Sequence, residues 1–448
     1  IEMGKKLFSL CMALVLCLSL LPATALAADG DTVYVGGVAL MGSTESPAYA
    51  TTDTSGTVTT SGADENKYNI KWDGSTLTLD GAKIKGADSS GSLSATVGIY
   101  AFNSSGDVSL KIALEGVNEI FKSSSGIWVY SSSSDTASLT ITGGGSLNSS
   151  GGSSGILVQS NSGNATLNIQ GADVGATVSS ASGDGVIVRA GSSSSASASL
   201  TVDGGSLTAT GKGDYSAGIR YLFGSSSFGS GTPSLTVSGN AMVKASGGYG
   251  GISDNSSADI QIGDGNNSSG GIVFDNGTGT VYGSVTLEEN LTIGKDESLT
   301  LDSGASLNAG GHNVIVDGGT VDDSIKNSLS ESVKYTPSIT TTSLPGGTVG
   351  TVYSQTLTAT GSGTITWSLA EGSSMPDGLT LNSNGTITGT PSTAGTNAFT
   401  VTAKNAYGDD SKQLTLTIGA AANVPVKSVS LTPSTMALEA GKSGTLTA

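Results

Sequence analysis

Cysteine, histidine and arginine are almost missing from this chain of 448 residues. The two cysteines, Cys11 and Cys17, lie near the start, so the rest of the chain can form no disulfide, bind no metal through thiolates and use no cysteine nucleophile. His312 is the single histidine, and a serine–histidine–aspartate triad or a histidine-based metal site would have to be built around it alone. We interpret His312 as a surface residue. These absences exclude most of the common catalytic constellations.

Charge is also scarce, and most of it is negative. Charged residues make up 12% of the chain, and the formal net charge is −17 at pH 7. Such a chain repels nucleic-acid phosphates and anionic membrane surfaces, so neither is an expected partner. Aromatic residues reach only 5%, whereas glycine contributes 67 residues. Low charge combined with regularly spaced aliphatic residues is typical of many short strands.

Residues 1–27 have the parts of a secretory signal peptide. Lys5 and Lys6 precede an apolar run over residues 7–21, and the Ala-Leu-Ala sequence that ends at Ala27 supplies the small residues at which signal peptidase cuts. The apolar run is shorter than the roughly 20 residues that a membrane-spanning helix needs, which favours cleavage over retention as an anchor. We therefore predict a secreted or cell-surface protein without an integral membrane segment.

One phrase, a glycine followed by isoleucine or valine, recurs six times and is called here the Gly-Ile phrase. It opens short apolar stretches in steps of 28 to 33 residues, at Gly98, Gly126, Gly155, Gly185, Gly218 and Gly251. A second strand pattern follows each phrase about a dozen residues later, as in Ser109-Leu-Lys-Ile112. A third pattern follows a glycine-containing turn, as in residues 205–210. A period of this size indicates stacked units.

Each repeat thus holds three short strands, and no helical pattern of ten or more residues interrupts them. Like strands must then lie parallel on one another, about 4.8 Å apart. This predicts an all-β fold that begins with a parallel β-helix, a solenoid of the pectate-lyase type. The predicted inner stack is Ile99, Ile127, Ile156, Val186, Ile219 and Ile252, and the next wall carries Leu110, Leu139, Leu167, Leu200, Leu235 and Ile260. The alternative is a twin-sheet sandwich, which also has short alternating strands.

The predicted β-helix spans residues 86–330, with entry strands over residues 28–85 that cover its open first coil. From Ser284, phrases centred on leucine recur every eight residues, which indicates smaller final coils or a capping sheet. Prolines then appear, and residues 336–418 hold about seven strand patterns in about 80 residues. That density predicts an immunoglobulin-like β-sandwich.

Three segments resemble families of bacterial surface proteins. Residues 337–418, with Pro376-Asp-Gly-Leu379 and Gly389-Thr-Pro391, resemble immunoglobulin-like or dystroglycan-type cadherin-like modules. Residues 424–448 resemble the opening strands of a bacterial group 2 immunoglobulin-like domain, cut short at Ala448. Val35-Gly-Gly-Val38 with Leu77-Thr-Leu-Asp80 resembles the start of right-handed β-helical, carbohydrate-binding-type surface proteins of gut Gram-positive bacteria. The resemblances imply that further immunoglobulin-like domains or a cell-wall anchor follow in the natural protein.

The leading candidate site is the outward side of the first strand in each repeat. If Ile99 and Ile127 point inward, alternation turns their neighbours outward. The predicted binding residues are Tyr100, Phe102, Trp128 and Tyr130, followed by the only two arginines, Arg189 and Arg220. Aromatic planes pack on the C–H faces of pyranose rings, and guanidinium groups bind sugar carboxylates. The alternative is that a cap strand or the loop over residues 211–233 covers the rings.

Acidic residues give weaker candidates. Glycoside hydrolysis needs two carboxyl groups about 5–10 Å apart. The acids near consecutive coils are Asp184, Asp203 and Asp214, all beside glycines or in turns, where aspartate commonly has a structural role. Calcium could be bound by the oxygen ligands of Asp264, Asn266 and Asp275, but the Gly-Gly-x-Gly-x-Asp nonapeptide pattern is absent, and no cofactor is expected.

These patterns together favour a non-catalytic, adhesin-like protein at the cell surface. It would bind glycans or a host or matrix surface through the side of the β-helix, carried on immunoglobulin-like spacers. The alternative is a polysaccharide-degrading lyase or glycoside hydrolase on the same scaffold. Carboxylates that converge with the rings in one groove would favour the enzyme, whereas a flat stripe without them would favour binding.

Overall fold

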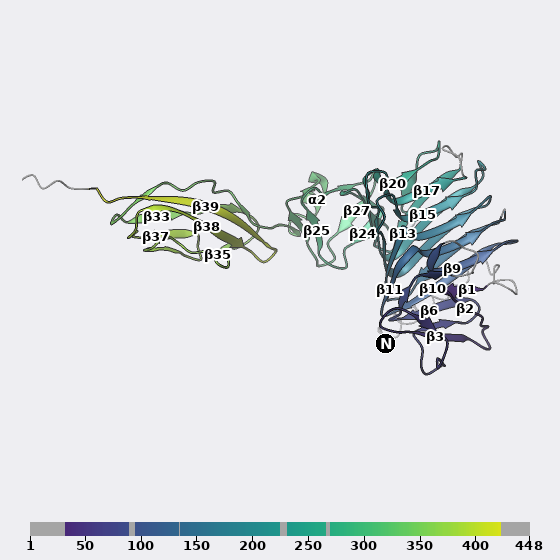
Figure 1. Ribbon diagram of the computed structural model, residues 1–448. Coiled ribbons are helices and arrows are strands. Elements are labelled where there is room, and N and C mark those ends of the chain that lie inside the picture. Colours follow the sequence, from purple (N-terminus) through teal and green to yellow (C-terminus); the bar gives the residue numbers. More distant parts are fainter. Residues whose placement is uncertain (1–31, 89–94, 134, 225–230, 266–268, 423–448) are drawn as a thin grey trace, which may run out of the picture. The chain divides into compact units, whose positions relative to one another are not determined.

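The computed structural model describes residues 32–88, 95–133, 135–224, 231–265 and 269–422 (Figure 1). They belong to two compact units, one that ends at Val333 and one that begins at Lys334. Strands dominate both units, and the described residues contain one short helix, α2 (Asp323–Ser328). The all-β prediction is confirmed. The predicted signal peptide and the predicted group 2 immunoglobulin-like segment lie outside the described residues.

Strands that contain the Gly-Ile phrase pair in parallel to form one sheet, called here the first wall, and their arrows lie one above another in Figure 1. These strands are β9 (Thr96–Asn103), β11 (Val117–Ser131), β13 (Ser146–Ser160), β15 (Asp184–Ala190), β17 (Ala217–Phe223) and β20 (Gly250–Asp254). The register joins Ile99, Ile127, Ile156, Val186, Ile219 and Ile252 into one column. This is the predicted inner stack, and all six side chains are buried.

A second wall forms in the same way from the leucine-centred strands. Its members are β6 (Thr76–Asp80), β10 (Val108–Glu115), β12 (Ala137–Thr142), β14 (Ala165–Val178), β16 (Ser197–Thr210), β18 (Thr232–Ser238) and β21 (Gln261–Gly263). The predicted leucine column is in register as far as Leu235. Its last member is Ile262 and not the predicted Ile260, which lies before β21. The two isoleucines are two residues apart, so the alternating pattern fits both registers equally.

A third wall completes each coil. It contains β7 (Lys83–Lys85), the first halves of β11 and β13, the second halves of β14 and β16, β19 (Ala241–Ser246) and β22 (Gly271–Asp275). Aliphatic side chains from all three walls share one core. The like-on-like parallel pairing has the register that the β-helix prediction requires, and it differs from the antiparallel pairing of a twin-sheet sandwich.

The glycine of the Gly-Ile phrase lies where backbone segments approach each other closely. A Cβ at Gly185 would lie 2.6 Å from the Thr210 nitrogen, 2.7 Å from the Gly218 oxygen and 2.8 Å from the Ala176 oxygen. At Gly218 the nearest backbone atoms would be 2.5 Å away. Contacts this short leave no room for a side chain, so the chain turns from the third wall into the first wall through glycine.

Antiparallel strands cover the first coil. Hairpin strands β1 (Val33–Val35) and β2 (Val38–Leu40) add to β9, with Tyr34 opposite Tyr100. Strands β3 (Ala48–Thr52), β4 (Val58–Thr59) and β5 (Ile70–Trp72) extend the sheet beyond β6, and β8 (Ala87–Asp88) pairs with the start of β9. Strands β1 to β5 and β8 therefore pair antiparallel, whereas β6 and β7 pair in parallel with the next coil.

Smaller coils follow β22. Strands β23 (Thr278–Tyr282), β26 (Ser298–Leu301) and β29 (Thr320–Val321) pair in parallel, as do β24 (Ser284–Thr286) with β27 (Ser306–Asn308), and β25 (Leu291–Gly294) with β28 (Val314–Asp317). Leu291 lies in β25, Leu299 in β26 and Leu307 in β27, and the three side chains share one core. The eight-residue spacing thus corresponds to one short strand per side of a smaller coil.

The second unit is a β-sandwich with its own core. One sheet contains β32 (Gly347–Thr348), β39 (Asp409–Gly419), β38 (Gly395–Lys404) and β35 (Thr366–Leu369), and the other contains β33 (Tyr353–Thr356), β37 (Thr386–Gly389) and β36 (Leu379–Leu381). A small pair, β31 (Ser338–Ile339) with β34 (Ala359–Thr360), completes the unit, and β30 (Val333–Tyr335) lies at its boundary. Trp367, Ile387 and Phe399 from both sheets pack together. No helix in the described part of the chain is long and apolar enough to cross a membrane.

Candidate functional site

The site candidates lie on the outer face of the first wall, where side chains form two columns. The first column is Tyr100, Trp128, Leu157, Ile187, Arg220 and Ser253, and the second is Phe102, Tyr130, Gln159, Arg189 and Leu222. Parallel strands lie about 4.8 Å apart, so neighbours in a column can touch. The face changes from aromatic at β9 and β11 to basic at β15 and β17.

The aromatic end is a closed cluster of four rings. The Trp128 ring centroid lies 5.4 Å from that of Tyr100 and 5.6 Å from that of Tyr130. The Phe102 centroid lies 5.4 Å from Tyr130 and 6.1 Å from Tyr100. The Trp128 and Tyr130 ring planes are inclined by only 27°, so these two rings stack against each other. The structure therefore brings the four predicted rings together.

Tyr100 differs from the other three rings because the cap covers it. Its side chain is 4% exposed, and the Tyr34 ring lies 6.3 Å away, centroid to centroid. Burial, followed by the nearby Tyr130 and Tyr34, raises the pKa of Tyr100 to about 12. Phe102 is 36% exposed, and Trp128 and Tyr130 are partly exposed. The predicted outward ring of Tyr100 thus supports the other three instead of meeting solvent.

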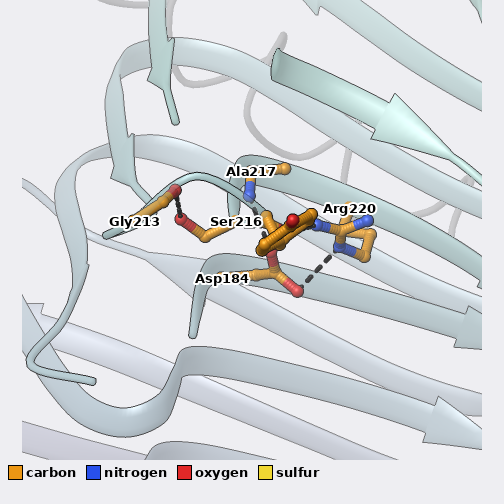
Figure 2. A network of polar contacts seen from close by, with 6 residues as sticks. Asp184, Gly213, Ser216, Ala217 and Arg220 are labelled. Atoms are coloured by element: carbon orange, nitrogen blue, oxygen red, sulfur yellow. Dashed lines mark hydrogen bonds and ion pairs between the residues drawn. The ribbon is translucent and has the colours of Figure 1, made fainter. Parts of the chain in front are cut away.

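The basic end is organised around one buried carboxylate. Figure 2 shows Asp184 between the Ala217 amide, which donates to Oδ1 at 2.7 Å, and Arg220, whose Nε donates to Oδ2 at 2.8 Å. The Arg220 guanidinium also donates to the Tyr215 carbonyl at 2.6 Å and lies 5.5 Å from the Tyr249 ring centroid. Asp184 is 7% exposed. These contacts hold Arg220 and the loop over residues 211–216 in one arrangement.

Arg189 lies on the same face without such partners. Its Nε is buried and has no hydrogen-bond partner among the described residues. Burial lowers the pKa of Arg189, and the Asp184 carboxylate partly opposes that shift. Two guanidinium groups are therefore within electrostatic reach of a single carboxylate. Among the ion pairs of the described residues, Asp184 is matched with Arg220 and none involves Arg189.

Unpartnered polar atoms gather on this face as well. Within the described residues, three buried side-chain nitrogen or oxygen atoms have no hydrogen-bond partner: Trp128 Nε1, Arg189 Nε and Ser253 Oγ. All three belong to the outer face of the first wall. An unsatisfied buried polar group costs about 1–3 kcal/mol, so their concentration on one face calls for a functional explanation. Neighbouring side chains cover these atoms, so a ligand would reach them after side-chain rotation.

The remaining acidic candidates do not converge on this face. Asp203 Oδ1 accepts a hydrogen bond from Ser238 Oγ at 2.7 Å, and Asp214 is exposed in the loop beside Tyr215. Asp184 is already paired with Arg220. The contacts of Asp184 and Asp203 therefore favour structural roles over the general acid and base that glycoside hydrolysis needs. The single histidine, His312, is partly exposed in the turn between β27 and β28.

The calcium candidates are likewise separated. Asp275 ends β22 at the turn into β23, and its Oδ1 accepts from the Ile252 amide at 3.2 Å. Asp264 lies against Gly283, at the opposite end of the same hairpin. Asn266 lies outside the described residues. The structure does not bring Asp264 and Asp275 together, and no group of three or more histidine, cysteine, aspartate or glutamate residues in the described segments could hold a metal ion.

Several residues of the face escaped the sequence prediction. Ser253 is the last residue of the first column, and no sequence motif marks it. Tyr249 lies in the turn before the sixth Gly-Ile phrase. Tyr215 was expected only as part of a covering loop, whereas its carbonyl binds Arg220. The sequence feature that could have pointed to these residues is a tyrosine shortly before β17, Tyr215, and another just before β20, Tyr249. Their relation to Arg220 depends on strand stacking and not on local sequence.

Comparison with known proteins identifies the C-terminal part of the chain. The family model described as "Putative Ig domain" matches residues 315–419, which include the sandwich, so the chain carries an immunoglobulin-like domain. No curated protein matches the chain.

Solved structures share only short segments with this chain. A "putative alpha-galactosidase" from Bacteroides fragilis is 30% identical over 19% of this chain and 18% of its own, with a TM-score of 0.18. A SusE-like surface located polysaccharide binding protein from Bacteroides thetaiotaomicron is 18% identical over 23% of this chain and 16% of its own, with a TM-score of 0.16. Extracellular domains 3–5 of Drosophila OTK are 19% identical over 19% of this chain and 32% of their own, also with a TM-score of 0.16. The chain thus spans less than a fifth of the first two, and scores this low carry no argument about function.

Proposed function

We propose that this chain is a secreted or cell-surface, non-catalytic, adhesin-like protein that binds glycans along the outer face of the first wall. The immunoglobulin-like unit would act as a spacer. The observation that carries the proposal is the coincidence on one face of three accessible rings, two arginines and all three unpartnered buried side-chain polar atoms of the described residues.

The aromatic end has the chemistry for sugar stacking. Trp128 and Tyr130 are partly exposed, and an accessible aromatic ring suits the C–H face of a pyranose. The Trp128 indole N–H is buried and has no partner in the described structure, so a sugar hydroxyl could accept from it only after side-chain rotation. Tyr100, fixed under Tyr34, keeps the Trp128 ring in place from below. A site on paired strands is also more rigid than one on loops, which lowers the entropy lost on binding.

The non-catalytic part of the proposal rests on the charges near the rings. Asp184 is the buried carboxylate that contacts Arg220, and its two oxygens already accept from Ala217 and Arg220. A general acid or base must reach the reacting bond with a proton to give or take. Asp184 is buried beneath Arg220 and therefore fits a structural role better.

The test is a glycan array with the full chain and three variants. We expect Trp128→Ala to lose at least about fivefold in affinity for the glycans that the wild type binds, because one stacked aromatic ring contributes about 1–3 kcal/mol where nucleic-acid bases stack on it. Trp128→Phe keeps a ring but removes the N–H, so its affinity should lie between those of the wild type and Trp128→Ala. Tyr68→Ala is the matched control, since Tyr68 is 37% exposed but lies in the cap.

Two results would contradict the proposal. Equal binding by the wild type and Trp128→Ala would show that the rings do not contact the glycan. Release of reducing or unsaturated ends from pectin or mucin by the purified chain would show that the protein is an enzyme, which is the alternative function.

A further inference from the structure

The basic end of the outer face has the features of an anion site within a strongly acidic protein. The chain has a net charge of −17 and only two arginines, and both arginines lie on this face, on the neighbouring strands β15 and β17. In the second column, Gln159 alone separates Arg189 from Tyr130. Asp184 neutralises one of the two charges, and the other has no paired carboxylate in the part of the chain that the structure describes.

The two arginines differ in how they are held. Arg220 is fixed by the Asp184 carboxylate, the Tyr215 carbonyl and the Tyr249 ring. Arg189 donates none of the hydrogen bonds found among the described residues, although its Nε is buried. A guanidinium group carries five N–H donors in a fork that matches two anionic oxygens. Arg189 therefore has its hydrogen-bonding capacity unused, beside a neighbour that is already oriented.

Exposed rings flank this end of the face. Tyr215 is 80% exposed and Tyr249 is 63% exposed, and they precede β17 and β20 on consecutive coils. The Tyr249 amide donates to the Ser216 carbonyl at 2.9 Å, which joins the two loops. Large exposed rings beside a guanidinium provide apolar contact for a sugar ring whose charged group meets the arginine.

The spacing along the face suits an extended ligand. Trp128 and Arg220 belong to the same column and are separated by Leu157 and Ile187. Three steps of about 4.8 Å place their backbones about 14 Å apart. The intervening side chains are partly exposed and leave a continuous surface. A linear oligosaccharide could therefore contact the aromatic and the basic ends together.

We propose that the ligand of the outer face is an acidic glycan, whose carboxylate or sulfate group binds Arg189 with Arg220 beside it while its neutral rings stack on Trp128 and Tyr130. This inference rests on the proposed glycan-binding function and names the class of glycan. Carboxylates and sulfate esters offer the same paired anionic oxygens, so the experiment compares both.

The scarcity of arginine makes a direct test practical. In a sample of the full chain labelled with ¹⁵N-arginine, the two side chains give two Nε–Hε signals, and Arg189→Lys assigns them. We expect oligogalacturonate to shift the Arg189 signal and its methyl ester to leave it unchanged. A sulfated oligosaccharide without carboxyl groups, such as one from κ-carrageenan, distinguishes a sulfate ligand from a carboxylate ligand. If neither acidic probe moves the Arg189 signal, the inference is overturned.

Affinity measurements give an independent readout. Arg189→Gln should weaken binding of the acidic oligosaccharide about tenfold, the scale of one charge-assisted hydrogen bond, and leave a neutral oligosaccharide unaffected. The affinity of Arg189→Lys for the acidic oligosaccharide should lie between those of the wild type and Arg189→Gln, because lysine keeps the positive charge but lacks the paired N–H donors of the guanidinium group. Lys111→Gln is the matched control, since Lys111 is exposed on the second wall.

The two proposals fail in different ways. Equal wild-type affinity for acidic and neutral oligosaccharides, both weakened by Trp128→Ala, would overturn the anion site and leave glycan binding intact. Binding that depends on Arg189 but not on Trp128 would overturn the stacking function and leave the anion site intact.

Discussion

Replacing Gly185 with alanine should destabilise the first unit, because the position has no room for a side chain. The added Cβ would meet three backbone atoms at 2.6–2.8 Å, and backbone cannot rotate away as a side chain can. Overpacking of this kind costs about 1–3 kcal/mol. Gly144 is the matched control, since a Cβ there would have no heavy atom within 4 Å. Alanine at an open position should be neutral or stabilise by up to about 1 kcal/mol through the unfolded chain.

Thermal unfolding followed by circular dichroism measures this difference. For domains of about 150–250 residues, 1 kcal/mol corresponds to about 2–4 °C, and the first unit is larger, so Gly185→Ala should lower the unfolding midpoint by at least about 1 °C and Gly144→Ala should not lower it. Hydrogen exchange should also become faster in β15 and β17, whose corners lie beside the substituted residue. An equal or higher midpoint for Gly185→Ala than for Gly144→Ala would refute the close-packing explanation of the repeated glycine.

Two further predictions concern ionisable groups. Tyr100 keeps its proton to a pH of about 12 in the folded chain, whereas an unfolded tyrosine loses it near 10.0, so stability should fall as the pH rises from about 10 to about 12, and this fall should be smaller in Tyr100→Phe. Absorbance at 295 nm and denaturant unfolding across that range measure both quantities; identical curves for the two proteins would contradict the burial of Tyr100. Asp184→Asn should cost about 1–3 kcal/mol, because Arg220 loses its counter-charge, and limited proteolysis should then cut the loop over residues 211–216 faster. The exposed Asp214→Asn is the control and should change stability by less than about 0.5 kcal/mol; an equal effect of the two substitutions would contradict a structural role for Asp184.

Much of the strand register could be predicted from the sequence, because the same residue types recur at the same repeat positions. The column from Ile99 to Ile252 needs only period-two alternation and a fixed starting glycine. Where the pattern is locally degenerate, the prediction failed, as at Ile260 and Ile262. The sandwich could be predicted from the number and spacing of its strands.

The site was less predictable because its properties depend on contacts between distant segments. Alternation places Tyr100 outward, but strand β1, from more than sixty residues earlier, covers it. Asp184 looks like a turn residue beside Gly185, and its role as the partner of Arg220 depends on the stacking of β15 and β17. No local pattern shows that Tyr249 packs on that arginine. Sequence thus identified the outward residues, and the fold decides which of them are accessible, covered or paired.

The repeats differ in length but keep their strands in register, which limits how the outer face of the first wall can change in evolution. The steps between Gly-Ile phrases vary from 28 to 33 residues, yet the columns stay aligned, so insertions between strands leave the outer face unaltered. The length of the face is set by the number of coils and can change only in discrete increments of about 4.8 Å. Duplication or loss of one complete coil would move the aromatic and basic ends apart or together by one increment without altering either end. Ligand length and ligand chemistry could therefore evolve separately in a chain of this design.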